Sequence, residues 1–153
     1  MPRKFRIRDG AYPHFITSTF VDWLGLLCRD DYFQVLAASL RHCCEKRGLL
    51  VHAYVLMPSH FHAICSCEGN DLPDVVRDMK KHTAKVIARK LEKDGRSMWL
   101  NACLRASGRA DGAKVWQPEY HPVEMRTQPV FEQRVNNVHN NPVRAGYVED
   151  AVQ

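Results

Sequence analysis

Two neighbouring segments of β-forming residues constrain the fold of this chain more than any other feature. Residues 49–57 form an apolar run dense in β-formers, and residues 60–67 again resemble a strand. Only Pro58-Ser59 separates the two segments. A β-hairpin is the simplest arrangement for two strands with so short a connection.

The rest of the pattern places helices around this hairpin. Residues 14–21 are rich in Phe, Ile, Thr and Val and are predicted to form a strand. Helices are predicted over residues 30–47, 71–94 and 127–141, with Pro142 ending the last one. The inward stripe of the first helix is predicted to be Phe33, Leu36, Ala37, Leu40 and Cys44. This order predicts an α+β fold with helices packed on a mostly antiparallel sheet, as a single domain over residues 1–153.

The distribution of positive charge suggests an anionic partner. The chain has 22 Lys and Arg against 17 Asp and Glu, a net charge of +5. One basic group lies in the first ten residues and another on the predicted helix 71–94, and each could contact phosphates or simply form a solvated face. The candidate DNA contacts are Arg3, Lys4, Arg6, Arg8, Arg77, Lys80, Lys81 and Lys85.

No stretch of the sequence reaches the roughly 18 uninterrupted apolar residues of a membrane helix, and no signal peptide is recognised, so we expect a cytoplasmic protein without a membrane partner. The six cysteines do not follow the paired spacing of a zinc site. Reduced, buried thiols are therefore expected.

His60-Phe61-His62 is the most informative triplet in the sequence. Side chains at i and i+2 of a strand point to the same face, so both imidazoles would lie side by side while Phe61 enters the core. Two neutral imidazoles are half of a metal site. The alternative is a pair of surface or hydrogen-bonded histidines.

Two further segments carry candidate functional residues. Asn137 and Asn141 are spaced to share one face of the last helix, away from its apolar residues, and an Asn oxygen can complete the coordination of a divalent cation. The alternative is that this asparagine-rich segment is an ordinary helix terminus. Residues 116–122 are aromatic and rigid, and are predicted to be a packing or strand-entry segment in preference to a surface on which bases stack.

Taken together, these motifs resemble a known family. The residues around His60-Phe61-His62 resemble the histidine–hydrophobe–histidine (HUH) motif of single-tyrosine transposases. The run 138–148, with Asn-Pro-Val-Arg-Ala-Gly at its centre, and the segment 116–124 resemble the REP-associated tyrosine transposases. The resemblance covers about residues 5–149 and implies a ferredoxin-like HUH transposase fold.

The resemblance also implies a chemistry and a partner. In the family, two histidines and a polar residue on a late helix hold one divalent metal, Mg or Mn, and here these would be His60, His62 and Asn141. A tyrosine then cleaves and rejoins hairpin single-stranded DNA through a phosphotyrosine, without a nucleotide cofactor. The resemblance therefore implies a nucleoid-associated transposase or single-strand endonuclease, acting as a monomer or a dimer.

The sequence departs from the family at the nucleophile, because the position of the tyrosine holds Asn137. A carboxamide cannot form a phosphotyrosine-type ester. Three interpretations follow. The protein binds hairpin DNA without cutting it; or Tyr120 or Tyr147 replaces the nucleophile; or the metal activates water, as in a plain nuclease. We expect that strand transfer is lost.

Two functions of other classes remain open at this point. A metal-dependent phosphoesterase for small substrates could use the same histidines, but no carboxylate in residues 57–67 is available as its acid–base group. The chain could also be a basic α+β domain without an active metal.

Overall fold

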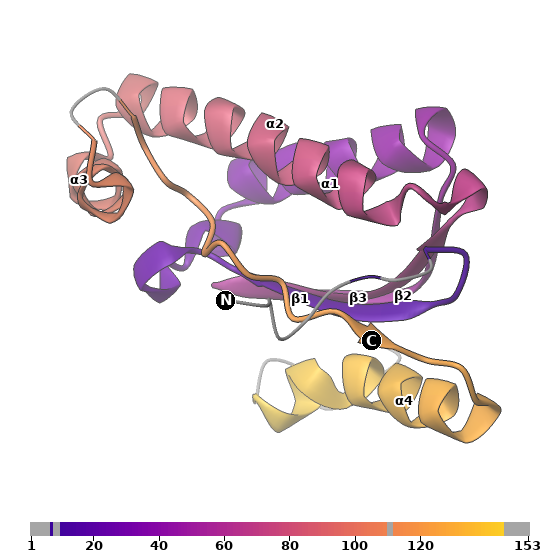
Figure 1. The fold of residues 1–153 in the computed structure, drawn as a ribbon. Helices are drawn as coiled ribbons and strands as arrows, with labels where there is room; N and C mark the ends of the chain where they lie inside the picture. Colours follow the sequence, from indigo (N-terminus) through magenta and orange to yellow (C-terminus); the bar gives the residue numbers. More distant parts are fainter. Residues whose placement is uncertain (1–6, 8–9, 110–111, 146–153) are drawn as a thin grey trace.

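The fold is a four-stranded antiparallel sheet covered by helices on both faces (Figure 1). The structure is a computed structural model that describes residue 7 and residues 10–109 and 112–145. The strands are β1 (His14–Thr19), β2 (Leu49–Met57), β3 (His60–Cys67) and β4 (Val123–Glu124), in the spatial order β2-β3-β1-β4. The predicted α+β class with a mostly antiparallel sheet is confirmed.

The hairpin predicted from residues 49–67 is present as β2 and β3. The two strands pair from Leu49 opposite Cys67 to Met57 opposite His60, with Pro58 and Ser59 forming the turn. The register shifts between Val51 and Ala53, as in a β-bulge. β3 also pairs with β1 and so lies inside the sheet rather than at its edge.

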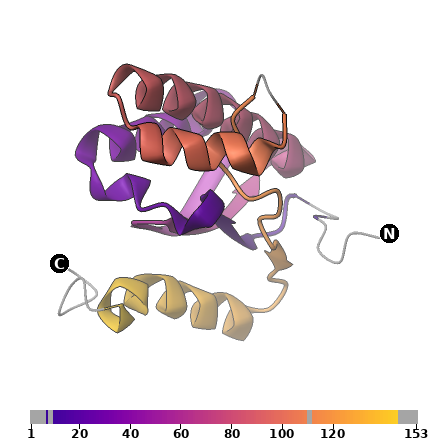
Figure 2. The ribbon, with the colours of Figure 1, turned by 90° about the vertical axis from the view of Figure 1, so that its left-hand side faces the viewer.

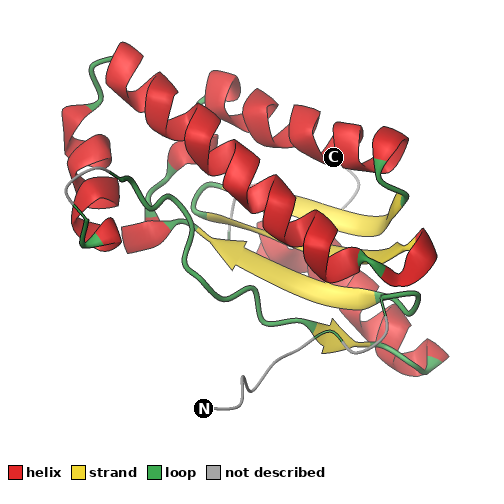
Figure 3. Ribbon diagram, turned by 45° about the horizontal axis from the view of Figure 1, so that its top comes forward, coloured by secondary structure: helices red, strands yellow, loops and turns green. Residues whose placement is uncertain are grey.

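Helices α1 (Asp30–Lys46) and α2 (Leu72–Lys93) lie side by side on one face of the sheet, and α4 (Gln128–Arg144) covers the other (Figures 1 and 3). The short helices η1 (Val21–Trp23) and η2 (Leu26–Cys28) connect β1 to α1, and η3 (Glu68–Asn70) connects β3 to α2. Figure 2 shows the resulting layers, with α2 above the sheet and α4 below it.

The main core lies between the sheet and α1 and α2. Phe61 of β3 is fully buried there, and its ring lies 5.7 Å from that of Trp116. Trp116 also stacks on Phe20 at 4.2 Å, and its indole N–H donates to Thr83 Oγ1 at 2.9 Å. The predicted packing role of the segment around Trp116 is confirmed.

A smaller apolar cluster joins the sheet to α4, and its fully buried members are Ala53, Ile64, Met125 and Val138. The helix continues to Arg144, so the prediction that Pro142 ends it is wrong by three residues. A proline in the last turn removes one backbone donor but lets the turn close, as the hydrogen bond from Ala145 N to Asn141 O (3.1 Å) shows.

Two other details differ from the sequence predictions. The stripe that α1 buries includes Tyr32, Leu36 and Cys43, whereas Cys44 is exposed. The helix α3 (Ser97–Ser107) was not predicted, and Gly108 ends it in a left-handed conformation (φ 65°).

The six cysteines are all free thiols, and the prediction that they are buried fails for Cys28 and Cys44, which are exposed. Helices long and apolar enough to cross a membrane are absent from the described residues.

Candidate functional site

The strand periodicity of β3 places His60 and His62 together on the sheet face that α4 covers. Phe61 points into the core on the other face, so both imidazoles point away from it. Their ring centroids lie 4.8 Å apart with an interplanar angle of 73°. The predicted side-by-side arrangement of the two histidines is present.

A hydroxyl group holds each imidazole through the same ring nitrogen. Thr17 Oγ1 lies 2.8 Å from His62 Nδ1, and Ser59 Oγ lies 3.1 Å from His60 Nδ1. Nothing among the described residues hydrogen-bonds either Nε2. With the proton on Nδ1, each Nε2 presents a lone pair, which is how a second residue orients a metal-binding histidine.

Burial keeps both imidazoles in the neutral form that a metal requires. Loss of solvation lowers the pKa of His60. The same cause, together with the neighbouring His60, lowers the pKa of His62 to about 4. Neither ring has to lose a proton at neutral pH before it can coordinate a cation.

Aromatic and cationic side chains surround the histidine pair. Phe15 of β1 stacks on His62, with ring centroids 5.3 Å apart, and the Arg134 guanidinium of α4 lies 5.1 Å from the centroid of the Phe15 ring. On the other side, the Trp23 ring meets that of His60 nearly perpendicularly at 6.2 Å. The site therefore includes residues from β1, β3, η1 and α4.

Asn137 and Asn141 continue the edge of α4 that Arg134 begins. They follow it by three and seven residues, and unlike Asn136 and His139 both are half-buried. Figure 1 shows that the last turns of α4 lie toward the end of the sheet at which β1 leads into η1. His60 pairs with Thr19 at the same end. The helix rises roughly 10 Å from Arg134 to residue 141. A strand rises about 13 Å over four residues, which is the length of β1 from Phe15 to Thr19. On these rises, residue 141 is expected near the level of the histidine pair along the sheet.

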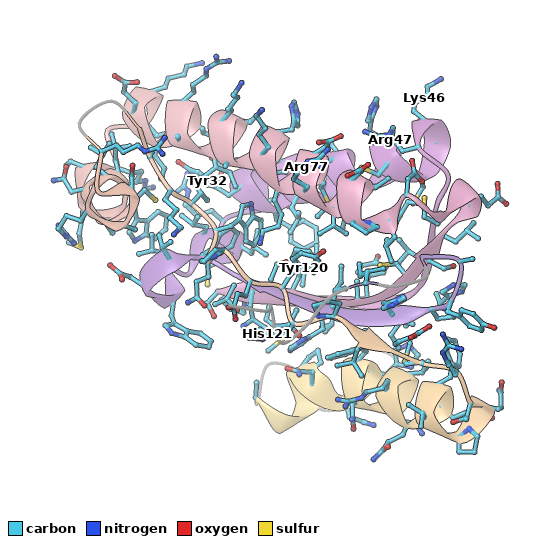
Figure 4. The ribbon with its side chains drawn as sticks, viewed as in Figure 1. Tyr32, Lys46, Arg47, Arg77, Tyr120 and His121 are labelled. Carbon is cyan, nitrogen blue, oxygen red and sulfur yellow. The ribbon has the colours of Figure 1, made fainter. Side chains whose placement is uncertain are left out.

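The structure separates the basic residues of α2 from this site. Arg77 lies on the outer side of α2, where it pairs with Asp74 and Asp78 (Figure 4). Lys80 is half-buried and donates to Gln117 O at 2.9 Å, and burial lowers its pKa to about 8. Lys81 and Lys85 are exposed on the same helix, across the sheet from the histidines. Arg3, Lys4, Arg6 and Arg8 lie outside the described residues.

Of the two candidate replacement tyrosines, the structure describes Tyr120. Tyr120 packs on the core below α2, with Lys80 Nζ 5.4 Å from its ring centroid (Figure 4). Its backbone C=O accepts a hydrogen bond from Thr17 N at 2.9 Å. Tyr147 lies outside the described residues.

Sequence reasoning missed several residues of the site, among them Thr17, Trp23 and Arg134. Thr17 is one of two threonines in β1, and only the register of β1 against β3 places it opposite His62. Trp23 could have been noticed as a large aromatic residue just after a strand. Arg134 carries no local signal apart from its charge.

The architecture is shared with solved transposase structures. Over 99% of this chain and 78% of the other, it resembles a REP-associated tyrosine transposase solved with a REP hairpin, with a TM-score of 0.71 and 20% identity. A candidate transposase from Deinococcus radiodurans is similar over 92% of this chain and 95% of its own, with a TM-score of 0.56 and 17% identity. At these identities the similarity establishes the fold: this is an α+β transposase fold.

The sequence gives the family. The model of IS200-like transposases matches residues 27–132, more than half of the chain, and the protein belongs to that family. No curated protein matches the sequence.

Proposed function

We propose that this protein binds hairpin single-stranded DNA through a divalent-metal site at His60 and His62, and that it no longer transfers strands through a tyrosine. The observation that carries the proposal is the histidine pair itself. Both rings are neutral, both are held at Nδ1 by hydroxyls, and both lie on the face covered by α4.

The family implies Mg²⁺ or Mn²⁺, which the two imidazoles would hold with the help of an oxygen ligand. The described residues contain no group of three His, Cys, Asp or Glu side chains placed to hold a metal ion, so a third ligand from them would be of another type. Asn141, half-buried on the edge of α4 near the level of the histidines, offers an amide oxygen. When bound, such a metal acts as a Lewis acid and a template on one phosphodiester.

Asn137 supports the loss of strand transfer. It lies one helical turn before Asn141, on the same half-buried edge, and its amide has no ionisable hydroxyl. Tyr32 and Tyr120 pack in the core on the α1 and α2 side, and Tyr54 pairs across the hairpin with Ala63, which faces that same core. All three lie on the α1 and α2 side of the sheet, which supports the loss of a tyrosine nucleophile at the histidines.

Hairpin DNA is the partner that the family and the fold favour. One similar structure was solved with a REP hairpin, and this chain carries a net charge of +5. Arg134 adds a positive charge next to the histidine pair, where a backbone phosphate would be held. We therefore expect the protein to associate with the nucleoid.

A phosphoesterase for small substrates is supported less well. Such an enzyme would enclose its substrate beside the histidines. A cavity of about 480 Å³ is present, but it lies between α1 and α2, lined by residues such as His42, Cys43 and His82. That cavity and the histidine pair lie on opposite faces of the sheet.

Titration of a labelled REP-like hairpin with the protein in Mn²⁺ tests the proposal. We expect a metal-dependent complex that His60→Ala and His62→Ala weaken, while His139→Ala, an exposed histidine of α4, leaves it unchanged. After denaturation, no protein should remain on the DNA. Absence of binding to hairpin, single-stranded and duplex DNA would reject the partner, and a covalent adduct would show that a nucleophile survives.

A further inference from the structure

Trp23 is an exposed aromatic ring beside the histidine pair. Its side chain is 65% exposed, the highest value among the exposed aromatic residues described. Even so, its ring centroid is only 6.2 Å from that of His60, at 78°. The protein's other two tryptophans are packed: Trp116 is 4% exposed, and Trp99 lies against Tyr32 and Arg96. Trp23 is therefore not used for folding in the way that they are.

The backbone holds Trp23 in an unfavourable conformation. Asp22 and Trp23 have φ angles of 51° and 53°, in the left-handed region that bulky L-residues rarely adopt. The buried residues Phe20 and Val21 anchor the turn, and Trp23 N donates to Phe20 O at 3.2 Å. Conformations of this kind persist where the surroundings fix them, and they concentrate at functional sites.

One residue ties this turn to the histidine site. Ser59 O accepts a hydrogen bond from Phe20 N at 3.0 Å, while Ser59 Oγ lies 3.1 Å from His60 Nδ1. The turn between β2 and β3 thus links the backbone that carries Trp23 to the imidazole of His60, because Ser59 bonds to both. The backbone of Trp23 is therefore fixed beside the histidine site.

We propose that Trp23 is a stacking platform for one unpaired nucleobase of the bound DNA. The inference rests on the proposed function, since the base belongs to a nucleotide flanking the phosphate held at His60 and His62. Unpaired bases expose both faces and stack on aromatic side chains irrespective of their sequence. The indole is largely open to solvent and adjoins the histidines, so it can receive such a base without any rearrangement of the core.

Binding of an end-labelled hairpin with a single-stranded overhang, measured by fluorescence anisotropy in Mn²⁺, tests the inference. Trp23→Ala should weaken binding roughly 5- to 140-fold, the range found when base–aromatic stacking is removed. Trp23→Phe should recover most of the affinity. Tyr54→Ala is the matched control, because Tyr54 is 57% exposed but lies on the hairpin's other face, and it should bind like the wild type.

Two measurements separate stacking from a structural effect. Trp23→Gly removes the ring and suits a positive φ, so it should melt no lower than the wild type yet bind as weakly as Trp23→Ala. Abasic substitution along the overhang should identify one position at which the wild type loses affinity. At that position Trp23→Ala should show no further loss.

The outcomes distinguish this inference from the function on which it rests. If the wild type binds no DNA, both fail. If His60→Ala weakens binding but Trp23→Ala behaves like Tyr54→Ala, the metal site stands and the stacking platform is rejected. It is also rejected if every abasic position affects the wild type and Trp23→Ala equally.

Discussion

Thr17 Oγ1 lies 2.8 Å from His62 Nδ1, so a hydroxyl on β1 fixes an imidazole on the neighbouring strand β3. The two residues are also direct partners in the strand register. Contacts of this kind set the tautomer and the ring orientation of a metal-binding histidine. The pairing of β1 with β3 therefore orients His62 for its proposed role as a metal ligand.

Thr17→Val should lower the affinity for Mn²⁺ about 10- to 100-fold, because it keeps the shape of the side chain but removes the hydroxyl. Thr17→Ser should restore the affinity. Isothermal titration of Mn²⁺ into each variant measures the effect, with far-UV circular dichroism to check the fold. Equal affinities for Thr17→Val and the wild type would mean that the hydroxyl does not orient the ligand.

Thr83→Val should destabilise the protein by about 1–3 kcal/mol, since it leaves the buried indole N–H of Trp116 without its acceptor. Urea unfolding gives the free energy of unfolding directly. Thr83→Ser retains the hydroxyl and should lose less stability. In a Trp116→Phe background, Thr83→Val should cost little, because the N–H is already absent; a full loss there would contradict this assignment.

The placement of the histidines could be predicted from the sequence because it depends only on local geometry. A two-residue connection fixes a hairpin, and an H-x-H triplet on a strand fixes which face the rings share. The partner Thr17 could not be predicted, since its place opposite His62 depends on pairing between strands 45 residues apart. The spacing of Asn137 and Asn141 predicts that they share one face of α4. Their burial could not be predicted, because it depends on how α4 packs against the sheet.

The errors in the helices have similar causes. Tyr32 and Phe33 are adjacent aromatics, and periodicity alone favoured Phe33. Tyr32 is buried instead because its ring meets Trp99 of α3 and its hydroxyl donates to Asp94 at 3.0 Å. Helix α3 gave no clear signal, since only Ala102 and Cys103 are fully buried along it.

Asp31 should make the stability of the protein depend on pH in the acidic range. The hydrogen bond from Lys90, with a further contribution from Arg29, lowers the pKa of Asp31 from 3.8 to about 2. A carboxylate whose pKa is lowered by folding stabilises the fold above its unfolded pKa, and that contribution is lost as the pH falls. We therefore expect the contribution to be complete above about pH 5 and to disappear toward pH 2.

Comparison of Asp31→Asn with the wild type by urea unfolding between pH 6 and 2 measures this contribution. The difference in unfolding free energy should shrink as the pH approaches 2. In a Lys90→Met background the pH-dependent part should be much smaller, because Lys90 Nζ, 3.0 Å from Asp31 Oδ2, is the main partner. A difference that does not vary with pH would contradict the assignment.

Arg134 should contribute to DNA binding more than the exposed lysines of α2. Its guanidinium lies over Phe15, which stacks on His62, whereas Lys81 lies across the sheet. If Arg134 neutralises one phosphate of a single strand, Arg134→Gln should reduce the slope of log affinity against log salt by about 0.7. Lys81→Gln is the matched charge change on α2. A larger reduction for Lys81→Gln would place the DNA on the α2 face.

Asn137→Tyr should restore a covalent protein–DNA adduct if the metal and DNA sites are intact. The new phenol would lie one turn before Asn141, on the half-buried edge that follows Arg134. Its attack on the phosphorus would release a 3′-hydroxyl and leave the 5′-phosphate on the tyrosine. A 3′-end-labelled hairpin incubated with Mn²⁺ should then yield a labelled protein band that survives denaturation.

Three further variants decide what the result means. Asn137→Phe supplies the same ring without the hydroxyl and should form no adduct. Asn136→Tyr places the phenol on the exposed side of α4 and should also form none. His60→Ala in the Asn137→Tyr background should abolish the adduct, since the site at the histidines would be lost. An Asn137→Tyr protein that folds and binds the hairpin but forms no adduct would show that the loss of strand transfer extends beyond position 137.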